Sequence, residues 1–199
     1  MSQWPTWLPL NERLKPLSPY GAPQIPAEAV LNTNENPFPL SPQLAKAIAA
    51  RVEGVARDLN RYPDRDATKL RIGLAGFINA LSATRLTEEN IWAANGSNEI
   101  IQSLFLAFGE RGAIGFTPSY SMHPLIARVT GCNWVDGSRR EDFSLDIDLA
   151  QKEILQNKPS LTFITTPNNP TGSSVTISEI EQLAKTVPGL LVVDEAYAE

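Results

Sequence analysis

The sequence is poor in cysteine and histidine, with one residue of each, Cys132 and His123, in 199. A single cysteine excludes an internal disulfide and a cysteine-based zinc site, and it fits a reducing compartment. No apolar run approaches the roughly 18 residues that a membrane-spanning helix needs. The N-terminus also lacks the basic start and long apolar stretch of a secretory signal. We therefore expect a cytoplasmic protein with no membrane partner.

Clusters of lysine and arginine are also absent, and the formal net charge is -5. This balance argues against nucleic acid as the main partner. The composition, 42% hydrophobic and 20% charged, is that of a globular protein with enough apolar residues for a sizeable core. A P-loop nucleotide site is excluded as well, because the only candidate loop, G-S-N-E, lacks the required lysine and glycine spacing.

The first half of the chain divides into an arm and a helical segment. Many of the 16 prolines fall within residues 1–40, which predicts an extended N-terminal arm. Ser41 and Pro42 then supply an N-cap and a first-turn proline, and a second helix is expected to start near Asp66. We assign residues 41–90 to the small-domain or linker region. Apolar residues follow Pro42 at helical spacing: Leu44, Ile48, Val52, Val55 and Leu59. The second helix is expected to bury Leu70, Leu74, Phe77, Ile78 and Leu81.

From residue 91 to 199, short apolar runs alternate with helical patterns. The runs predict strands over residues 91–95, 113–116, 133–138, 161–165 and 190–197. Helices are expected over residues 98–108, 121–129 and 148–155, and after a capping box formed by Ser178 and Glu181. This alternation indicates an α/β fold, a three-layer αβα domain with a mostly parallel sheet. The chain stops just after the last strand, so we expect this domain to be truncated.

Two of the strand ends carry amide, hydroxyl or glycine residues suited to a ligand. Gly96-Ser97-Asn98 leads into a helix N-terminus, where free N–H groups favour a phosphate. The alternative is a simple helix cap. After residues 161–165, Asn169 could project an amide donor from the rigid turn Pro170–Gly172, although such residues also favour an ordinary solvated turn.

A third strand end carries Asp194, which follows a fully apolar run. A carboxylate there is costly unless a cation or several donors pair with it, and the alternative is that it caps the next turn. Because ligands bind at the carboxyl ends of parallel strands, the three ends should meet. A phosphate cradle, an amide donor and a buried carboxylate are together the contacts that pyridoxal 5'-phosphate requires.

Six motifs resemble the fold-type I pyridoxal-phosphate aminotransferases. They are LNTNENPFPLSP, RYPD, ANGSNEIIQSLFLAF, TPSYSMHP, TPNNPTG and VVDEAY. The N-E-N-P and R-Y-P-D segments are similar to those of the histidinol-phosphate aminotransferase subgroup. The resemblance covers residues 10–199.

The resemblance implies roles for particular residues. Asp194 would pair with the pyridine nitrogen, and Asn169 and Tyr197 would bind the ring oxygen. Tyr120 would stack on the ring, or else be a core residue. The phosphate loop would be Gly96, Ser97 and Asn98.

Further roles implied by the resemblance extend to a partner subunit and to the substrate. Tyr62 would reach the phosphate of the other subunit, which implies a homodimer with shared active sites. Tyr20, Asn34 and Asn36 fall where the family's N-terminal arm covers the substrate, although a proline-rich arm could also simply pack on a partner. His123 matches no role in the family and is expected to be structural, as is Cys132.

The chain departs from the family in lacking the lysine that binds the cofactor aldehyde and shuttles the proton. In the family that lysine follows D-E-A-Y, and none of the lysines here fits its motif: Lys15, Lys46, Lys69, Lys152, Lys158 and Lys185. The arginine that follows it and the C-terminal small domain are missing too. We therefore assign no catalytic residue to residues 1–199 and expect them to be inactive alone.

Three functional hypotheses follow. The first is the N-terminal part of an enzyme that converts L-histidinol phosphate and 2-oxoglutarate to imidazole acetol phosphate and L-glutamate in histidine biosynthesis. The second is a related enzyme on the same scaffold, such as a threonine-phosphate decarboxylase or an aromatic aminotransferase. The third is a short non-catalytic binding module that retains the fold.

Overall fold

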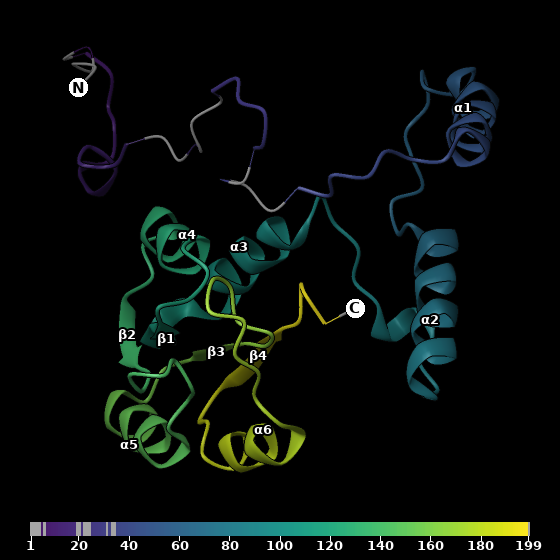
Figure 1. Cartoon of the computed structure of the whole chain (residues 1–199). Coiled ribbons are helices and arrows are strands. Elements are labelled where there is room, and N and C mark those ends of the chain that lie inside the picture. Colours follow the sequence, from purple (N-terminus) through teal and green to yellow (C-terminus); the bar gives the residue numbers. More distant parts are fainter. Residues whose placement is uncertain are drawn as a thin grey trace. The chain divides into compact units, whose positions relative to one another are not determined.

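The computed structural model describes residues 5, 7–18, 21, 25–30, 32 and 35–198. The chain forms two compact units (Figure 1). The first, here called the sheet unit, comprises Met1–Leu17 and Ala94–Glu199, and the second, the helical unit, comprises Ser18–Ala93.

The sheet unit is built on a parallel sheet with the strand order β2-β1-β3-β4. Its strands are β1 (Ala113–Thr117), β2 (Trp134–Ser138), β3 (Leu161–Thr165) and β4 (Leu190–Asp194). Its helices are α3 (Ser97–Phe108), α4 (Met122–Thr130), α5 (Ile147–Asn157) and α6 (Ile177–Ala184), with short 3-10 turns η1 (Glu12–Leu14) and η3 (Gly109–Arg111). This arrangement confirms the α/β fold with a parallel sheet.

Helices cover both faces of this sheet, α3 and α4 on one side and α5 and α6 on the other (Figure 1). On the first side, Phe105 of α3 stacks on Phe163 of β3 with ring centroids 5.3 Å apart. On the second side, Ile154 and Leu183 pack against Ile164 of the same strand. Because β3 is buried on both faces, its sequence LTFIT consists of apolar residues and buried threonines and has no charged residue.

The caps of two helices fix where the connecting loops end. Asp146 caps α5 by accepting a hydrogen bond from the Leu149 N–H. The capping box of α6 pairs Thr176 with Glu179, so the predicted pair, Ser178 and Glu181, was wrong by two residues. Thr176 has the extended backbone that an N-cap needs, whereas Ser178 already lies inside the helix.

The strand expected over residues 91–95 does not form. Residues 91–94 are irregular and follow the 3-10 helix η2 (Glu88–Asn90), and the Trp92 side chain is exposed. A strand exists only when a neighbouring strand takes up its backbone hydrogen bonds. None of the strand pairs in the described part of the chain includes this segment.

The helical unit contains α1 (Pro42–Ala56) and α2 (Thr68–Ser82). The Ser41 hydroxyl accepts a hydrogen bond from the Leu44 N–H, as expected for the N-cap of α1. The Arg71 guanidinium of α2 donates hydrogen bonds to the carbonyl oxygens of Glu88 and Ile91, which attaches η2 to the helix.

The apolar residues at helical spacing in these two helices are largely uncovered, which corrects the burial predicted for those of the second helix. The described side chains of α1 include none that is buried. Ala75 is the buried residue of α2, and only two of the residues predicted to face inward there, Leu74 and Ile78, are half-buried. The exposed members are Leu44, Ile48, Val52, Val55, Leu59, Leu70, Phe77 and Leu81. The apolar stripes form as expected, but so small a unit has too little chain to cover them.

Among the described residues, no helix is long and apolar enough to cross a membrane.

Candidate functional site

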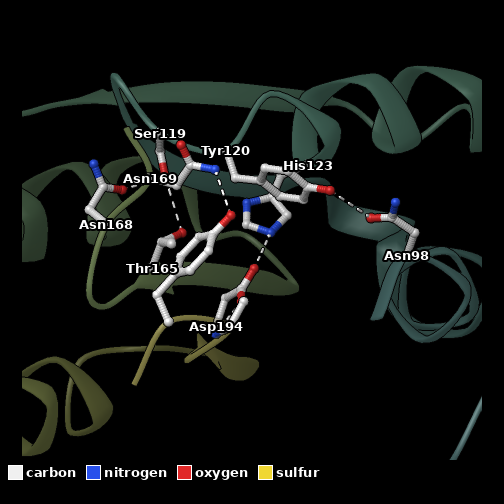
Figure 2. Close-up of polar contacts among 10 residues, drawn as sticks. Asn98, Ser119, Tyr120, His123, Thr165, Asn168, Asn169 and Asp194 are labelled. Carbon is white, nitrogen blue, oxygen red and sulfur yellow. Dashed lines mark hydrogen bonds and ion pairs between the residues drawn. The ribbon is translucent and has the colours of Figure 1, made fainter. Parts of the chain in front are cut away.

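The turns that follow β1, β3 and β4 lie at one edge of the sheet, beside the N-terminus of α3. Figure 2 shows the side chains of Asn98, Tyr120, Asn169 and Asp194 close together there. The sequence predicted that Asn98, Asn169 and Asp194 would meet at the ends of parallel strands, and the resemblance added Tyr120. Asn98 reaches this edge at the start of α3, because the strand expected before it does not form.

Asp194, the last residue of β4, is held by a buried histidine of α4. The His123 Nε2 lies 3.0 Å from Oδ2 of Asp194, and the two side chains are 2% and 11% exposed. The Ala196 N–H donates a hydrogen bond to the other carboxylate oxygen over 3.2 Å. The hydrogen bond from His123 holds the pKa of the Asp194 carboxyl below its usual value, although burial alone would raise it. Asp194 is therefore a carboxylate at neutral pH.

Sequence reasoning missed His123, which was expected to be structural. Its ring contacts Phe163, with centroids 4.7 Å apart, and meets the Tyr120 ring edge-on at 5.3 Å. A local signal existed, because residues three apart at a helix start lie on the same face. His123 is three residues after Tyr120, the residue that the sequence did assign to the site.

Asn169 and Tyr197 converge from two different turns. The Asn169 amide Nδ2 donates a hydrogen bond to the Tyr197 hydroxyl over 3.2 Å (Figure 2). Asn169 is half-buried and Tyr197 is 40% exposed. Two donors thus meet at one point that solvent can reach. The resemblance assigns both side chains to the same ligand oxygen.

Tyr120 connects the turn after β1 to the start of α3. Its hydroxyl donates a hydrogen bond to Asn98 Oδ1 over 3.3 Å. Gly96 is the N-cap residue of α3 and has a φ of 81°, which favours glycine. Because Gly96 has no side chain, it offers no side-chain oxygen to accept hydrogen bonds from the first backbone N–H groups of α3.

A cavity of about 370 Å³ opens between α3 and β4. Its polar lining includes Ser97, His123, Asp194 and Glu195, and its apolar wall comes from both elements. A volume of this order fits a small cofactor or substrate. Residues at the start of α3 and at the end of β4 therefore line the same cavity.

The other predicted residues belong to the helical unit or lie outside the described residues. Tyr62 belongs to the helical unit and is fully exposed. Asn36 belongs to the same unit, where its Oδ1 accepts a hydrogen bond from the Phe38 N–H. Tyr20 and Asn34 lie outside the described residues. Their roles stay predictions.

Cys132 has a structural environment. Its Sγ contacts the Gly109 carbonyl oxygen at 3.2 Å, and burial raises the pKa of the Cys132 thiol. A neutral thiol is a poor nucleophile. No cluster of His, Cys, Asp and Glu suited to a metal ion occurs among the described residues.

A parallel sheet covered on both faces, with polar side chains gathered at the carboxyl ends of its strands, is typical of ligand-binding α/β domains. The profile of the family Aminotransferase class I and II matches residues 28–199, so the chain belongs to that family. This finding confirms the resemblance seen in the sequence motifs.

Relatives named histidinol-phosphate aminotransferase match nearly the whole chain. The one from Mycobacterium marinum is 53% identical and covers 96% of this chain, and the match covers 51% of that relative. The one from Mycolicibacterium smegmatis is 51% identical, with 96% of this chain and 89% of the relative covered. The chain thus spans about half the length of the first relative.

A solved structure shares the fold. Histidinol-phosphate aminotransferase from Sinorhizobium meliloti, in complex with pyridoxal-5'-phosphate, superposes with a TM-score of 0.69 at 22% identity. The match covers 83% of this chain and 43% of that one.

Proposed function

We propose that this chain supplies the N-terminal half of a pyridoxal-phosphate-dependent histidinol-phosphate aminotransferase. The longer protein would transfer an amino group from L-histidinol phosphate to 2-oxoglutarate, as part of histidine biosynthesis. The name shared by relatives about 50% identical to the chain supports this donor over the related decarboxylase and aromatic substrates. The single cysteine supports a reducing, cytoplasmic setting.

The observation that carries the proposal is the buried Asp194 carboxylate with its His123 partner. A carboxylate that stays ionised at the floor of a site attracts a protonated ring nitrogen. Asp194 would therefore hold a proton on the pyridine nitrogen of the cofactor. Pyridoxal 5'-phosphate, when bound, supplies an electron sink for the α-carbon of an amino substrate.

The neighbouring side chains fit the remaining parts of this cofactor. Asn169 and Tyr197, which already meet, would donate hydrogen bonds to the ring oxygen. Tyr120 would cover one face of the ring. The open N-terminus of α3, with Ser97 and Asn98, would receive the phosphate. Together these contacts orient the ring and restrict water around it.

We further propose that the longer protein is a homodimer in which Tyr62 reaches the phosphate of the partner's site. The exposure of Tyr62 and of the apolar stripe on α1 supports a covering partner. Tyr20, Asn34 and Asn36 would cover the substrate. The lysine that binds the cofactor aldehyde would come from the part of the protein beyond residue 199.

The test is an assay of the protein at the length its own cells make it, established by intact mass. With L-histidinol phosphate and 2-oxoglutarate, the longer protein should form L-glutamate, whereas residues 1–199 alone should form none. A protein of 199 residues in the cell, or a longer protein active only on other amino donors, would contradict the proposal. Glutamate formation by the isolated 199-residue chain would contradict the expected inactivity.

A further inference from the structure

We propose that Asn168 is a positioning residue that cross-links the two turns bearing Tyr120 and Asn169, and so holds these two side chains in register for a common ligand. The identity of that ligand rests on the function proposed above. The cross-link itself rests on hydrogen bonds between residues of this chain.

The Asn168 side chain is 2% exposed, which is unusual for an amide and requires that its polar atoms be paired. Its Oδ1 accepts a hydrogen bond from the Ser119 hydroxyl over 2.7 Å. Its Nδ2 donates to the Pro118 carbonyl oxygen over 3.0 Å and to the Thr171 hydroxyl over 2.8 Å. One carboxamide therefore connects the turn after β1 with the turn after β3.

The backbone of Asn168 fixes the second turn as well. Its N–H donates to the Ser173 carbonyl oxygen over 2.8 Å, and its carbonyl oxygen accepts from the Gly172 N–H over 2.7 Å. The φ of Gly172 is 72°, a value that this tight turn requires and that favours glycine. The side chain of Asn168 thus extends from a rigid platform.

The network continues into a third segment. The hydroxyls of Thr171 and Ser173 lie 2.8 Å apart, and the Ser173 hydroxyl donates to the Phe143 carbonyl oxygen over 3.1 Å. Arg139, which follows β2, donates to that same carbonyl oxygen over 3.1 Å and to the Phe116 carbonyl oxygen over 2.9 Å. The ends of β1, β2 and β3 are therefore tied together beneath the site.

Each candidate ligand residue is adjacent in sequence to a member of the cross-link. Tyr120 follows Ser119, and Asn169 follows Asn168 (Figure 2). A shift of either turn would therefore move a side chain of the site directly. Sites of this kind depend on such supporting hydrogen bonds, because small displacements of a ligand residue weaken binding strongly.

The chemistry requires an amide at this position. Asn168 offers one acceptor to Ser119 and two donors to Pro118 and Thr171. An aspartate has the same shape but would place an oxygen 3.0 Å from the Pro118 carbonyl oxygen, two acceptors facing each other. Asn168→Asp therefore breaks the cross-link with little change in volume.

The experiment compares Asn168→Asp with the wild-type chain and with Asn157→Asp, an exposed asparagine of α5. Fluorotyrosine labelling allows the ¹⁹F resonances of Tyr120 and Tyr197 to be followed without any ligand. Affinity for pyridoxamine 5'-phosphate, which needs no lysine to bind, is measured on the same samples. Asn168→Asp should shift both resonances and weaken binding about tenfold or more, whereas Asn157→Asp should change neither.

The pH dependence separates positioning from packing. Protonation of the carboxylate introduced by Asn168→Asp restores an O–H donor toward Pro118 or Thr171, so the resonances should return toward their wild-type positions as the pH falls. Ser119→Ala, which cuts the cross-link from the other turn, should shift the Tyr120 resonance and provides the test if Asn168→Asp does not fold. Unchanged resonances in Asn168→Asp, or in Ser119→Ala in its place, overturn the proposal. A wild-type chain that binds no pyridoxamine 5'-phosphate speaks against the cofactor, and the ¹⁹F shifts still decide the cross-link.

Discussion

The contact between His123 and Asp194 provides a quantitative test of how the site is held. His123→Phe keeps an aromatic ring of similar shape against Tyr120 and Phe163 but removes the nitrogen that faces the carboxylate. Asp194→Ala removes the carboxylate. The two variants and their combination form a double-mutant cycle that isolates the energy of this one contact.

The magnitude follows from the burial of the pair. Hydrogen bonds to charged groups contribute about 1.5–3 kcal/mol to stability, and the low exposure of both side chains, 2% and 11%, places this one within that range rather than with surface ion pairs. The coupling energy should therefore be about 1.5–3 kcal/mol. Because the hydrogen bond from His123 lowers the pKa of the Asp194 carboxyl, replacing His123 with phenylalanine should raise that pKa.

The assay is urea unfolding of the 199-residue chain, followed by tryptophan fluorescence, because the Trp134 ring lies 6.2 Å from the His123 ring. A coupling energy below about 0.5 kcal/mol, the usual error of additivity, would refute the reasoning.

The pH dependence of the cost of His123→Phe gives a second check. The folded pKa of Asp194 is lowered, so the contact stabilises the fold above the ordinary aspartate value and is lost as the pH falls through the folded value. The cost of His123→Phe should therefore be smaller at about pH 3 than at about pH 5, and equal costs would mean that packing alone is lost.

Three further predictions concern the stability of the sheet unit. Thr162 has a fully buried hydroxyl with no hydrogen-bond partner among the described residues, so Thr162→Val should raise the free energy of unfolding by about 1 kcal/mol or more, and a lower urea midpoint would contradict this. Asp146→Ala removes the oxygen that accepts the Leu149 N–H over 3.0 Å and should cost about 1 kcal/mol in urea unfolding at neutral pH; no loss would mean that solvent caps α5 equally well. Gly189→Ala would place a Cβ 2.1 Å from the Ser160 carbonyl oxygen, so it should lower the free energy of unfolding by about 3 kcal/mol, and a wild-type thermal midpoint would show that the backbone can yield there.

Local sequence patterns predicted those helices and strands that a short stretch of sequence is enough to identify. The strand LTFIT has no charged residue and combines three apolar residues with two threonines, because both of its faces are covered, and such a run can be recognised in the sequence. The capping box shows the limit of such reading. The stretch TISEIE contains two overlapping pairs, Thr176 with Glu179 and Ser178 with Glu181, and only the backbone conformation decides between them.

Other features depend on chain segments that are distant in sequence. Residues 91–95 have strand-like composition, but a strand also needs a partner, which no local pattern reveals. The stripe on α1 shows the same limit, because periodicity indicates which face of a helix is apolar and not whether anything covers it. In both cases the local sequence indicates what a segment can form, whereas contacts with distant segments decide whether it pairs or is covered.

The candidate site shows which contacts a sequence can indicate and which it cannot. Asp194 and Asn169 were assigned to one candidate site because each follows an apolar run, and parallel strands bring their carboxyl ends together. His123 is 71 residues from its partner Asp194, and Asn168 is 49 residues from Ser119. The spacing of His123 from Tyr120 indicates that it lies near the site, but no local pattern predicts which distant residue either side chain contacts. In both cases a buried polar side chain forms a hydrogen bond with a distant segment, next to or opposite a residue of the candidate site. The supporting residues of a site of this kind are therefore found by asking how each buried polar atom is paired, and this question needs the structure.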